Sequence, residues 1–573
     1  MKKKLVSILT VALSCMLVLG GCGKTTTETP PPTAEQEAPS TSPVDGYVKA
    51  TDPSKNPSIA TDRKDTLVIG IEAPDGIYNP LYSEGMYDTY VMESMFTALL
   101  SVDEKGMPIE ALAESYTVSE DGLTYSFTLI EGLKFDDGSP LTTADVEFTY
   151  IAGCDKEYDG PTDFVNTTKI KGAKAYKEGT ASSIEGIKVV DEKTIEFTLE
   201  EVNADAIYDF TVGILSKEYY GKDYVQGYLN YIKDLHAKPL GCGAYKFVEN
   251  KPGQEVKLVA NENYYLGKPN IPNLIYKVTS ADTRLQMLQT GEIDMDMITV
   301  NEDNVNKLQE AGFLDIHIFP TNGYGYIGMN VENEKFADPK VRQALTYGLN
   351  RAEIVEASFT GGYADVINEP QSKESWAYSK GSNDYPYDPE KAAALLDEAG
   401  WKVGSDGIRE KDGKKFEIKF TASTPNEVNE AIIPVAQANY QELGIKFEAE
   451  QMDFNAVREQ VNSGKAEMFF MAWGLTPAAD ATGVFGTGGA QNKTGYSNPE
   501  LDALLLKGLQ EIDIEKRKVI YADVYELMNE DLPYIFLYQR KDMWAVNSRV
   551  KGFDDQITPY KRFTQSLHKL TLE

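Results

Sequence analysis

The sequence contains few of the residues that build most catalytic and metal centres. Its 573 residues include four cysteines, three histidines and four tryptophans. His236, His317 and His568 do not show the spacing of metal ligands, and the nucleophile pattern G-x-S-x-G is missing. Carboxylates are abundant, so composition alone leaves a two-acid hydrolase open. We expect a protein without a metal, without a cofactor and without an enzymatic activity.

Positive charge and long apolar runs are scarce as well. The 56 Lys and Arg are outnumbered by 89 Asp and Glu, which gives a formal net charge of −33. Binding to phosphate backbones needs basic patches, so nucleic acid is not an expected partner. In the stretch GTGGAQNKTG, Asn492 stands where a phosphate-binding loop requires glycine. Beyond the N-terminus, no run is long and apolar enough to cross a bilayer.

The N-terminus has a different character. Lys2 to Lys4 precede an uncharged run that ends at Gly21, directly before Cys22. A basic start, a short apolar core and small residues at the exit are typical of a secretory signal peptide, here residues 1–21. The exit LGGC resembles the lipobox of bacterial lipoproteins. That resemblance implies cleavage before Cys22 and a lipid on its thiol, which holds the protein at the outer face of the cell membrane.

The next segment predicts a tether. Residues 22–65 are rich in Thr, Pro, Ser, Glu and Ala, and such a composition buries too little apolar surface to order the chain, so we predict disorder. The rest of the chain is longer than one core usually serves, which favours two or three lobes. Its two cysteines, Cys154 and Cys242, form either one disulfide or two buried free thiols, and we favour free thiols.

Local patterns predict individual elements. In LAESYTVSEDGLTYSFTLIEGLKFDDGSPLTTADVEFTY (112–150), Tyr125, Phe127 and Leu129 alternate with polar residues as in a half-buried strand. Thr142 is placed to cap a helix. The stretch GIKVVDEKTIEFTLEE (186–201) predicts a hairpin.

Three further helix starts are marked by a capping residue followed by proline. They are at Asp338, Asp388 and Asn498. Gly400 is placed to end the helix that starts after Asp388.

The order of residues in 112–150 resembles the diagnostic segment of the large substrate-binding proteins of peptide-type ABC importers. This is the oligopeptide, dipeptide and nickel family. Similar stretches follow along the chain: GIYNPLY, GCGAYKF, LQTGEIDM, FADPKVRQALTYGLNRAEIVEASFTGGYADVINEP, YDPEKAAALLDEAGW, TGYSNPELDALL and DLPYIFLY. The resemblance extends from about Leu67 to Phe553. The chain is thereby identified as a member of family 5 of the bacterial extracellular solute-binding proteins.

The resemblance implies an α/β fold of the type II-like periplasmic binding protein class. Two main lobes and an inserted extra domain enclose a ligand cleft, and a hinge joins the lobes. We expect lobe I to combine residues 66–95, 230–322 and 539–573. Lobe II is inserted as residues 96–229, and lobe III as residues 323–538.

The resemblance also implies where the ligand contacts lie. The family's tryptophan-glycine turn matches Trp473 and Gly474. One family pattern places an ammonium-binding aspartate at Thr476, a departure, whereas a second pattern matches Asp480. Tyr324, Tyr326 and Tyr538 fall where the chain is expected to cross between lobes. The candidate substrate-binding residues are Trp473, Gly474, Asp480, Tyr324, Tyr326, Tyr538, Asn79, Tyr82 and Glu369, each with packing, capping or a solvated turn as its alternative.

These expectations define a function. A lipid-anchored, monomeric receptor outside the cell captures a peptide by hinge closure and delivers it to a membrane ABC permease. Alternatives on the same fold are a nickel complex or an oligosaccharide as ligand, or a peptide-sensing or adhesion lipoprotein that takes no part in transport. Sugar sites favour aromatic platforms, so the scarcity of tryptophan mildly favours peptides.

Overall fold

The computed structural model describes residues 46–553 and 557–573. The predicted signal peptide and Cys22 lie outside these residues. The end of the segment predicted as a disordered tether is ordered: β1 (Gly46–Val48), the 3₁₀ helix η1 (Pro53–Lys55) and α1 (Ser58–Thr61). This segment is ordered because β1 pairs with a strand of the main sheet, and Asp52, Asn56 and Arg63 form hydrogen bonds with Gly312, Asn547 and Gly291.

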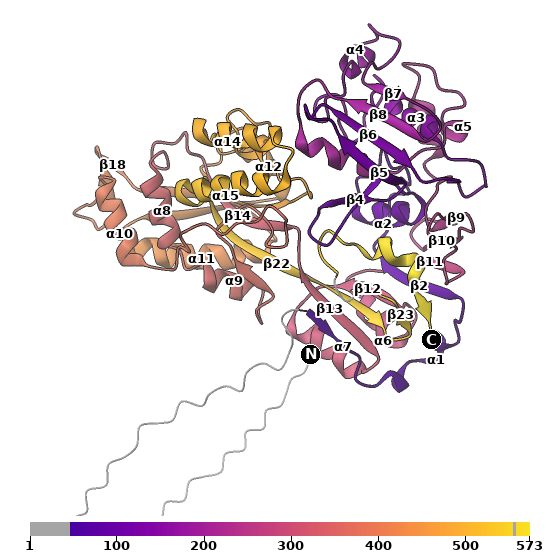
Figure 1. Ribbon diagram of the computed structural model, residues 1–573. Helices are drawn as coiled ribbons and strands as arrows, with labels where there is room; N and C mark the ends of the chain where they lie inside the picture. Colours follow the sequence, from indigo (N-terminus) through magenta and orange to yellow (C-terminus); the bar gives the residue numbers. More distant parts are fainter. Residues whose placement is uncertain (1–45, 554–556) are drawn as a thin grey trace, which may run out of the picture. The chain divides into compact units, whose positions relative to one another are not determined.

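A large mixed sheet runs through the molecule and has two halves that share one strand, β22 (Tyr534–Asn547). Its first half contains β2 (Thr66–Ile71), β9 (Tyr245–Lys251), β10 (Glu255–Ala260), β11 (Asn273–Val278), β12 (Met295–Ile298) and β13 (Leu314–Pro320). Its second half contains β14 (Gly323–Met329), β15 (Ala364–Val366), β19 (Glu417–Ser423), β20 (Lys446–Met452) and β21 (Met468–Gly474). Figure 1 shows β22 as one continuous yellow strand between β14 and β12.

A separate antiparallel sheet is inserted after β2 in the order β5-β6-β8-β7. Its strands are β5 (Ala113–Val118), β6 (Thr124–Leu129), β7 (Ile187–Val189) and β8 (Thr194–Thr198). The alternating burial of β6 and the β7–β8 pairing confirm the strand and hairpin predicted from the sequence. The smaller strand groups are β3 (Leu100–Val102) with β4 (Pro108–Glu110), β16 (Lys402–Val403) with β17 (Arg409–Lys411) and β18 (Lys414–Lys415), and β23 (Val550–Lys551) with β24 (Thr571–Leu572).

Helices cover the sheets, and none of those in the described residues is long and apolar enough to span a bilayer. Outside residues 323–538 they are α2 (Met86–Met95), α3 (Thr143–Gly153), α4 (Ala173–Lys177), α5 (Lys217–Tyr220), α6 (Arg284–Thr290) and α7 (Glu302–Ala311), with 3₁₀ helices η2 (Ala204–Thr211), η3 (Asn230–Leu235) and η4 (Phe563–Lys569). Within 323–538 they are α8 (Pro339–Tyr347), α9 (Arg351–Ser358), α10 (Pro389–Glu398), α11 (Glu427–Glu442), α12 (Phe454–Asn462), α13 (Thr482–Phe485), α14 (Pro499–Gln510) and α15 (Ile514–Asp531).

The helix ends follow the capping chemistry of the sequence. Asp338, Asp388 and Asn498 each accept a hydrogen bond from the first turn, with proline directly after the cap. Thr142 starts α3 with a complete capping box. Gly400, with φ +89°, follows α10 in the left-handed region, where glycine carries no steric penalty. These predictions are confirmed.

The buried apolar residues form two large clusters and one small one. One large cluster lies entirely between Tyr324 and Tyr538, within the range predicted for lobe III. The other joins residues of the ranges predicted for lobes I and II into one continuous core. A small cluster covers the other face of the first half-sheet, against α6 and α7. Cys154 and Cys242 lie in the second large cluster as buried free thiols, as predicted.

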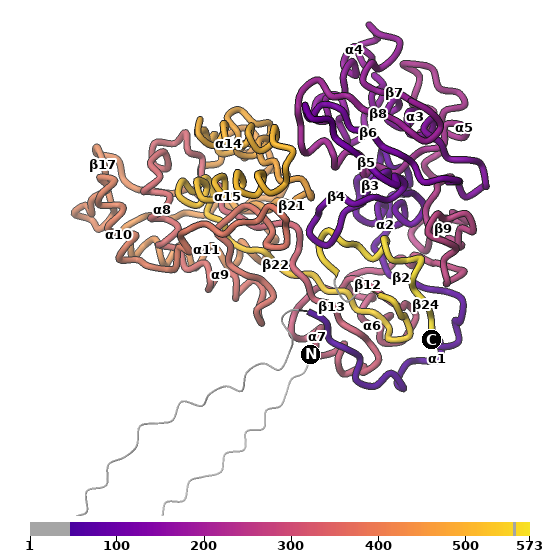
Figure 2. The backbone as a smooth tube through the Cα atoms, in the orientation of Figure 1, coloured from indigo at the N-terminus to yellow at the C-terminus, as the bar shows by residue number. Residues whose placement is uncertain are grey.

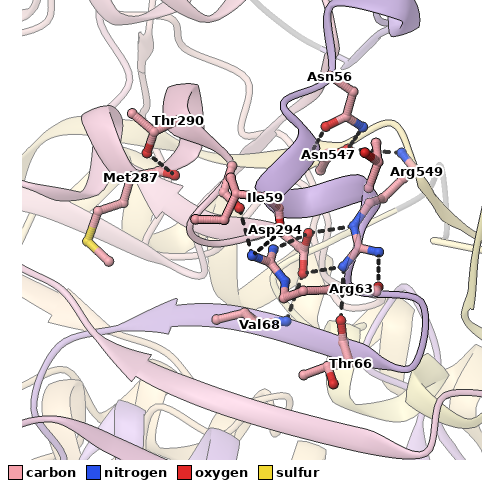
Figure 3. A network of polar contacts seen from close by, with 12 residues as sticks. Asn56, Ile59, Arg63, Thr66, Val68, Met287, Thr290, Asp294, Asn547 and Arg549 are labelled. Atoms are coloured by element: carbon pink, nitrogen blue, oxygen red, sulfur yellow. Dashed lines mark hydrogen bonds and ion pairs between the residues drawn. The ribbon is translucent and has the colours of Figure 1, made fainter.

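A buried ion network ties the N-terminal segment to lobe I (Figure 3). The Asp294 carboxylate is fully buried and forms ion pairs with Arg63 at 3.0 Å and with Arg549 at 2.8 Å. It also accepts the Val68 backbone N–H at 2.9 Å, at the start of β2. Arg549 donates in addition to the carbonyl oxygens of Arg63 and Thr66. Segments far apart in the sequence are therefore held by one carboxylate.

We expect Asp294→Asn to lower the free energy of unfolding by about 3 to 5 kcal/mol, because it leaves the buried Arg549 and the partly buried Arg63 without their counter-charge. Urea unfolding followed by circular dichroism measures this change. Asp303→Asn is the control, since Asp303 is an exposed partner of Lys307 in α7. A loss of stability no larger than that of the control would contradict the assigned role of the network.

Candidate functional site

The chain crosses twice between the two halves of the large sheet, and Figure 2 allows both crossings to be followed. The first crossing links β13 to β14 at Thr321 and Asn322, and the second is β22 itself. Thr321 N–H donates to the Arg540 carbonyl at 2.9 Å, so the crossings are hydrogen-bonded to each other.

The turn after β21 lies directly beside the first crossing. Trp473 and Gly474 end β21 and pair with the start of β14. Leu475 N–H donates to the Asn322 carbonyl at 2.9 Å, and Asn322 Nδ2 donates back to the Leu475 carbonyl at 2.7 Å. A Cβ atom added to Gly474 would meet nothing within 4 Å, so the space beside this turn is open. The structure thus places two of the predicted residues together at the crossing.

The three predicted tyrosines do not share one face of the sheet. Tyr324 and Tyr326 are 4% and 2% exposed and lie in the core of lobe III. Tyr538 pairs with Gly325, so its side chain points to the opposite face. There it contacts Phe359, with ring centroids 4.7 Å apart. All three side chains pack in the protein interior at the crossings.

Glu369 is buried beneath the segment that follows it. Its carboxylate accepts the Gly381 backbone N–H at 2.8 Å and the Tyr378 hydroxyl at 3.3 Å. Burial raises the pKa of Glu369, and these hydrogen bonds oppose the shift. In this structure the carboxylate holds a loop of lobe III.

Asn79 and Tyr82 lie in the core shared by lobes I and II, away from the lobe III residues. Asn79 is fully buried, and its Oδ1 accepts the Leu81 backbone N–H at 2.9 Å. The Tyr82 ring packs against Tyr158 and His236, with centroids 5.3 and 5.0 Å away. Both residues shape the turn before α2.

Asp480 lies where residues predicted for lobe III contact residues predicted for lobe II. Its Oδ1 accepts hydrogen bonds from the Thr482 backbone N–H at 3.0 Å and the Thr482 hydroxyl at 2.5 Å. Its own backbone N–H donates to Asp205 Oδ2 at 3.0 Å, across to η2 of lobe II. Burial raises the pKa of Asp480, and the charge of Asp205 adds to the shift. Both of these hydrogen bonds use Oδ1 of the carboxylate.

Three residues at this junction, Asp205, Arg517 and Trp376, were not among the candidates predicted from the sequence. Arg517 in α15 forms an ion pair with Asp205 at 2.5 Å, and its guanidinium lies 5.0 Å from the centre of the Trp376 ring. Burial alone would lower the pKa of Arg517, but the charge of Asp205 and its hydrogen bond raise it, so the side chain stays charged. When Asp205 and Asp480 are both ionised, Arg517 balances only one of the two carboxylates, and the junction carries one excess negative charge. Asp205 contacts Asp480 and Arg517, which lie 275 and 312 residues further along the chain. No local sequence pattern can therefore identify this junction.

The predicted residues lie away from the pocket at β13. A pocket of about 170 Å³ lies beside β13 and contains none of the predicted residues. Its lining residues are Gly46, His317, Ile318, Phe319, Pro320, Glu374, Ile557 and Thr558. Within residues 46–553 and 557–573, no group of three or more His, Cys, Asp or Glu side chains is arranged to hold a metal ion.

A family model of the bacterial extracellular solute-binding proteins, family 5 (middle region), matches residues 107–495. Among relatives, the oligopeptide-binding protein AppA of Bacillus subtilis is 31% identical over 502 residues, 85% of this chain and 88% of AppA. Heme-binding protein A of Haemophilus influenzae is 27% identical over 86% of this chain and 90% of its own length.

Solved structures show the same likeness. AppA from Bacillus subtilis, in complex with a nonapeptide, matches with a TM-score of 0.67 and 30% identity over 89% of this chain and 99% of AppA. NikZ from Campylobacter jejuni, in complex with Ni(L-His), matches with a TM-score of 0.70 and 28% identity over 89% of this chain and 99% of NikZ.

Proposed function

The chain belongs to family 5 of the bacterial extracellular solute-binding proteins, and we propose that it captures peptides outside the cell and delivers them to an ABC importer. The sequence-based assignment to this family and to its α/β binding-protein fold is confirmed. Proteins of this family bind a substrate and do not transform it, so the protein is a binding protein and not an enzyme.

The observation that carries the proposal is the likeness to AppA along nearly the whole chain. It holds for the sequence, at 31% identity, and for the backbone of a structure that contains a nonapeptide. A receptor that accepts many peptides gains affinity from their constant parts, the backbone amides and the charged termini. Asp480 supplies a carboxylate for the terminal ammonium at a junction with one excess negative charge.

Capture requires that the ligand binds one arrangement of the lobes better than another. The three predicted lobes, with lobes II and III inserted into lobe I, give such a ligand surfaces on more than one side. The turn at Trp473 and Gly474 and the loop at Asp480 supply the lobe III side of the proposed cleft. The carboxylate orients the amine, and the open space beside Gly474 receives the peptide backbone.

A nickel complex is the second candidate ligand, because the similar NikZ structure contains Ni(L-His). A sensing or adhesion role without transport uses the same binding step. Uptake of peptides by a strain that lacks the gene separates transport from sensing.

We expect native mass spectrometry of the purified protein to detect a mixture of short peptides. A tightly held ligand survives purification because its dissociation is slow. Retention of a single mass that contains nickel would support the second candidate and contradict the peptide proposal. A protein that retains nothing and binds no added peptide would contradict both.

A further prediction concerns Asp480. Asp480→Ala weakens binding of a peptide with a free amine by about 1.5 to 3 kcal/mol, because a charge-assisted hydrogen bond is lost. Calorimetry with the N-acetylated form of the same peptide gives the matched control, and its affinity changes little. Asp480→Asn keeps an acceptor for Thr482 but not the charge, and behaves like Asp480→Ala. Equal losses for both peptides exclude the ammonium role.

The proposed site of action requires an anchor, and we propose that it is a lipid on Cys22. Several acyl chains, at about 0.8 kcal/mol for each buried methylene, bind a membrane firmly, whereas one chain is marginal. Cys22→Ser abolishes incorporation of labelled fatty acid and either releases the protein into the medium or leaves the precursor uncut. Unchanged lipid labelling of this variant contradicts the anchor.

A further inference from the structure

One ion pair connects lobe II directly to lobe III. Asp205, at the start of η2, pairs with Arg517 in α15, 312 residues further along the chain. The distance from Arg517 Nη2 to Asp205 Oδ1 is 2.5 Å. The Arg517 side chain is 4% exposed and the Asp205 side chain 9%. This burial distinguishes the pair from exposed ion pairs on the surface, whose contribution to stability is small.

Lobe III alone fixes the arginine. Arg517 Nε donates to the Gly508 carbonyl at 3.1 Å, and the guanidinium lies over the rings of Trp376 and Tyr521, 5.0 and 5.7 Å from their centres. A guanidinium stacked on aromatic faces keeps its orientation. Lobe II contributes the Asp205 carboxylate, and that carboxylate also accepts the Asp480 backbone N–H at 3.0 Å. Two elements of lobe III, α15 and the Asp480 loop, therefore meet on one side chain of lobe II.

A second contact between these lobes lies nearby, at the turn between β3 and β4. The Lys105 carbonyl accepts the Trp376 backbone N–H at 3.2 Å. Gly106, with φ +81°, lies so close to Pro477 of lobe III that an added Cβ would be 3.2 Å from its Cβ atom. Met107 packs on the lobe III core. All these contacts form between protein groups and need no ligand.

The position of the ion pair determines what its loss does. Removing one partner of a buried pair inside a single lobe leaves a charge that only unfolding can hydrate. Between two lobes, the remaining charge becomes hydrated when the lobes separate. The energetic cost therefore appears as a shift between closed and open arrangements.

We propose that Asp205 and Arg517 form a latch that holds lobes II and III together in the absence of ligand. The latch sets the fraction of molecules in the closed arrangement, and the apparent affinity for a ligand scales with that fraction. It acts also on ligands without a free amine, because neither side chain has to contact them. This role goes beyond the proposed function, and its first test needs no ligand.

The test compares the ligand-free protein with Asp205→Asn by small-angle X-ray scattering. The amide side chain introduced by this substitution retains an oxygen for the Asp480 N–H but carries no charge for Arg517. We expect a larger radius of gyration and faster hydrogen exchange at the Asp480 amide, with an unchanged midpoint of thermal unfolding. Glu201→Gln is the control, because it removes a nearby charge whose partner, Lys169, is also in lobe II.

The conservative variant Asp205→Glu separates a role of the charge from a role of the shape. It restores the compact scattering profile if the ion pair holds the lobes. A profile of Asp205→Asn equal to that of the unaltered protein overturns the latch, as does an Asp205→Glu profile as expanded as that of Asp205→Asn.

Ligand affinity gives a separate test that rests on the proposed function. Asp205→Asn weakens the N-acetylated peptide by about 5- to 150-fold, the usual range of coupling between sites, and this peptide has no ammonium that could sense the lost carboxylate charge. The free-amine peptide loses at least as much. Asp480→Ala, in contrast, leaves the affinity for the N-acetylated peptide nearly unchanged. An N-acetylated peptide that binds Asp205→Asn as tightly as the unaltered protein overturns the effect of the latch on ligand affinity. A protein that binds neither peptide refutes the proposed function, while the scattering result still decides on the latch.

Discussion

The large sheet depends on one strand that is hydrogen-bonded to both of its halves. Up to Arg540, β22 pairs with β14 and β15, and from Lys541 onward it pairs with β13 and β12. The strand thus changes partners between the neighbouring residues Arg540 and Lys541. Any rotation of one half against the other has to bend the backbone there and at the neighbouring antiparallel crossing through Thr321 and Asn322.

Two buried ion pairs illustrate how location determines the role of the same chemistry. Asp294 meets Arg549 and Arg63 where the N-terminal segment packs on the first half of the large sheet, and its carboxylate is fully buried there, so no movement between lobes exposes it to water. Asp205 meets Arg517 between lobes, where separation hydrates both. The first arrangement contributes to the stability of the fold, and the second to the balance between closed and open arrangements. Neither role follows from the residue types alone.

Local chemistry made many elements predictable. The caps at Asp338, Asp388 and Asn498, the alternation in β6 and the hairpin of β7 and β8 involve residues close in sequence. The sequence did not predict that residues 46–63 are ordered. Residues 46–63 have the composition of a tether, but β1 pairs with β13 and Arg63 reaches Asp294, and both partners lie more than two hundred residues away.

The candidate site was predictable only in part. The resemblance located the Trp473–Gly474 turn and Asp480, and the structure places the turn beside a chain crossing and Asp480 at a lobe junction. It did not show that Tyr538 faces away from Tyr324 and Tyr326, because a bulge in the pairing of β14 with β22 sets that orientation.

The sequence by itself determined the family, the α/β class, the positions of most helix starts and the absence of common catalytic motifs, because each of these depends on residue order or on nearest neighbours. Only the tertiary structure decided which charges meet, which tyrosines share a face and which residues share a core. These outcomes depend on the pairing of strands and helices that are hundreds of residues apart, and no local pattern encodes such a distance.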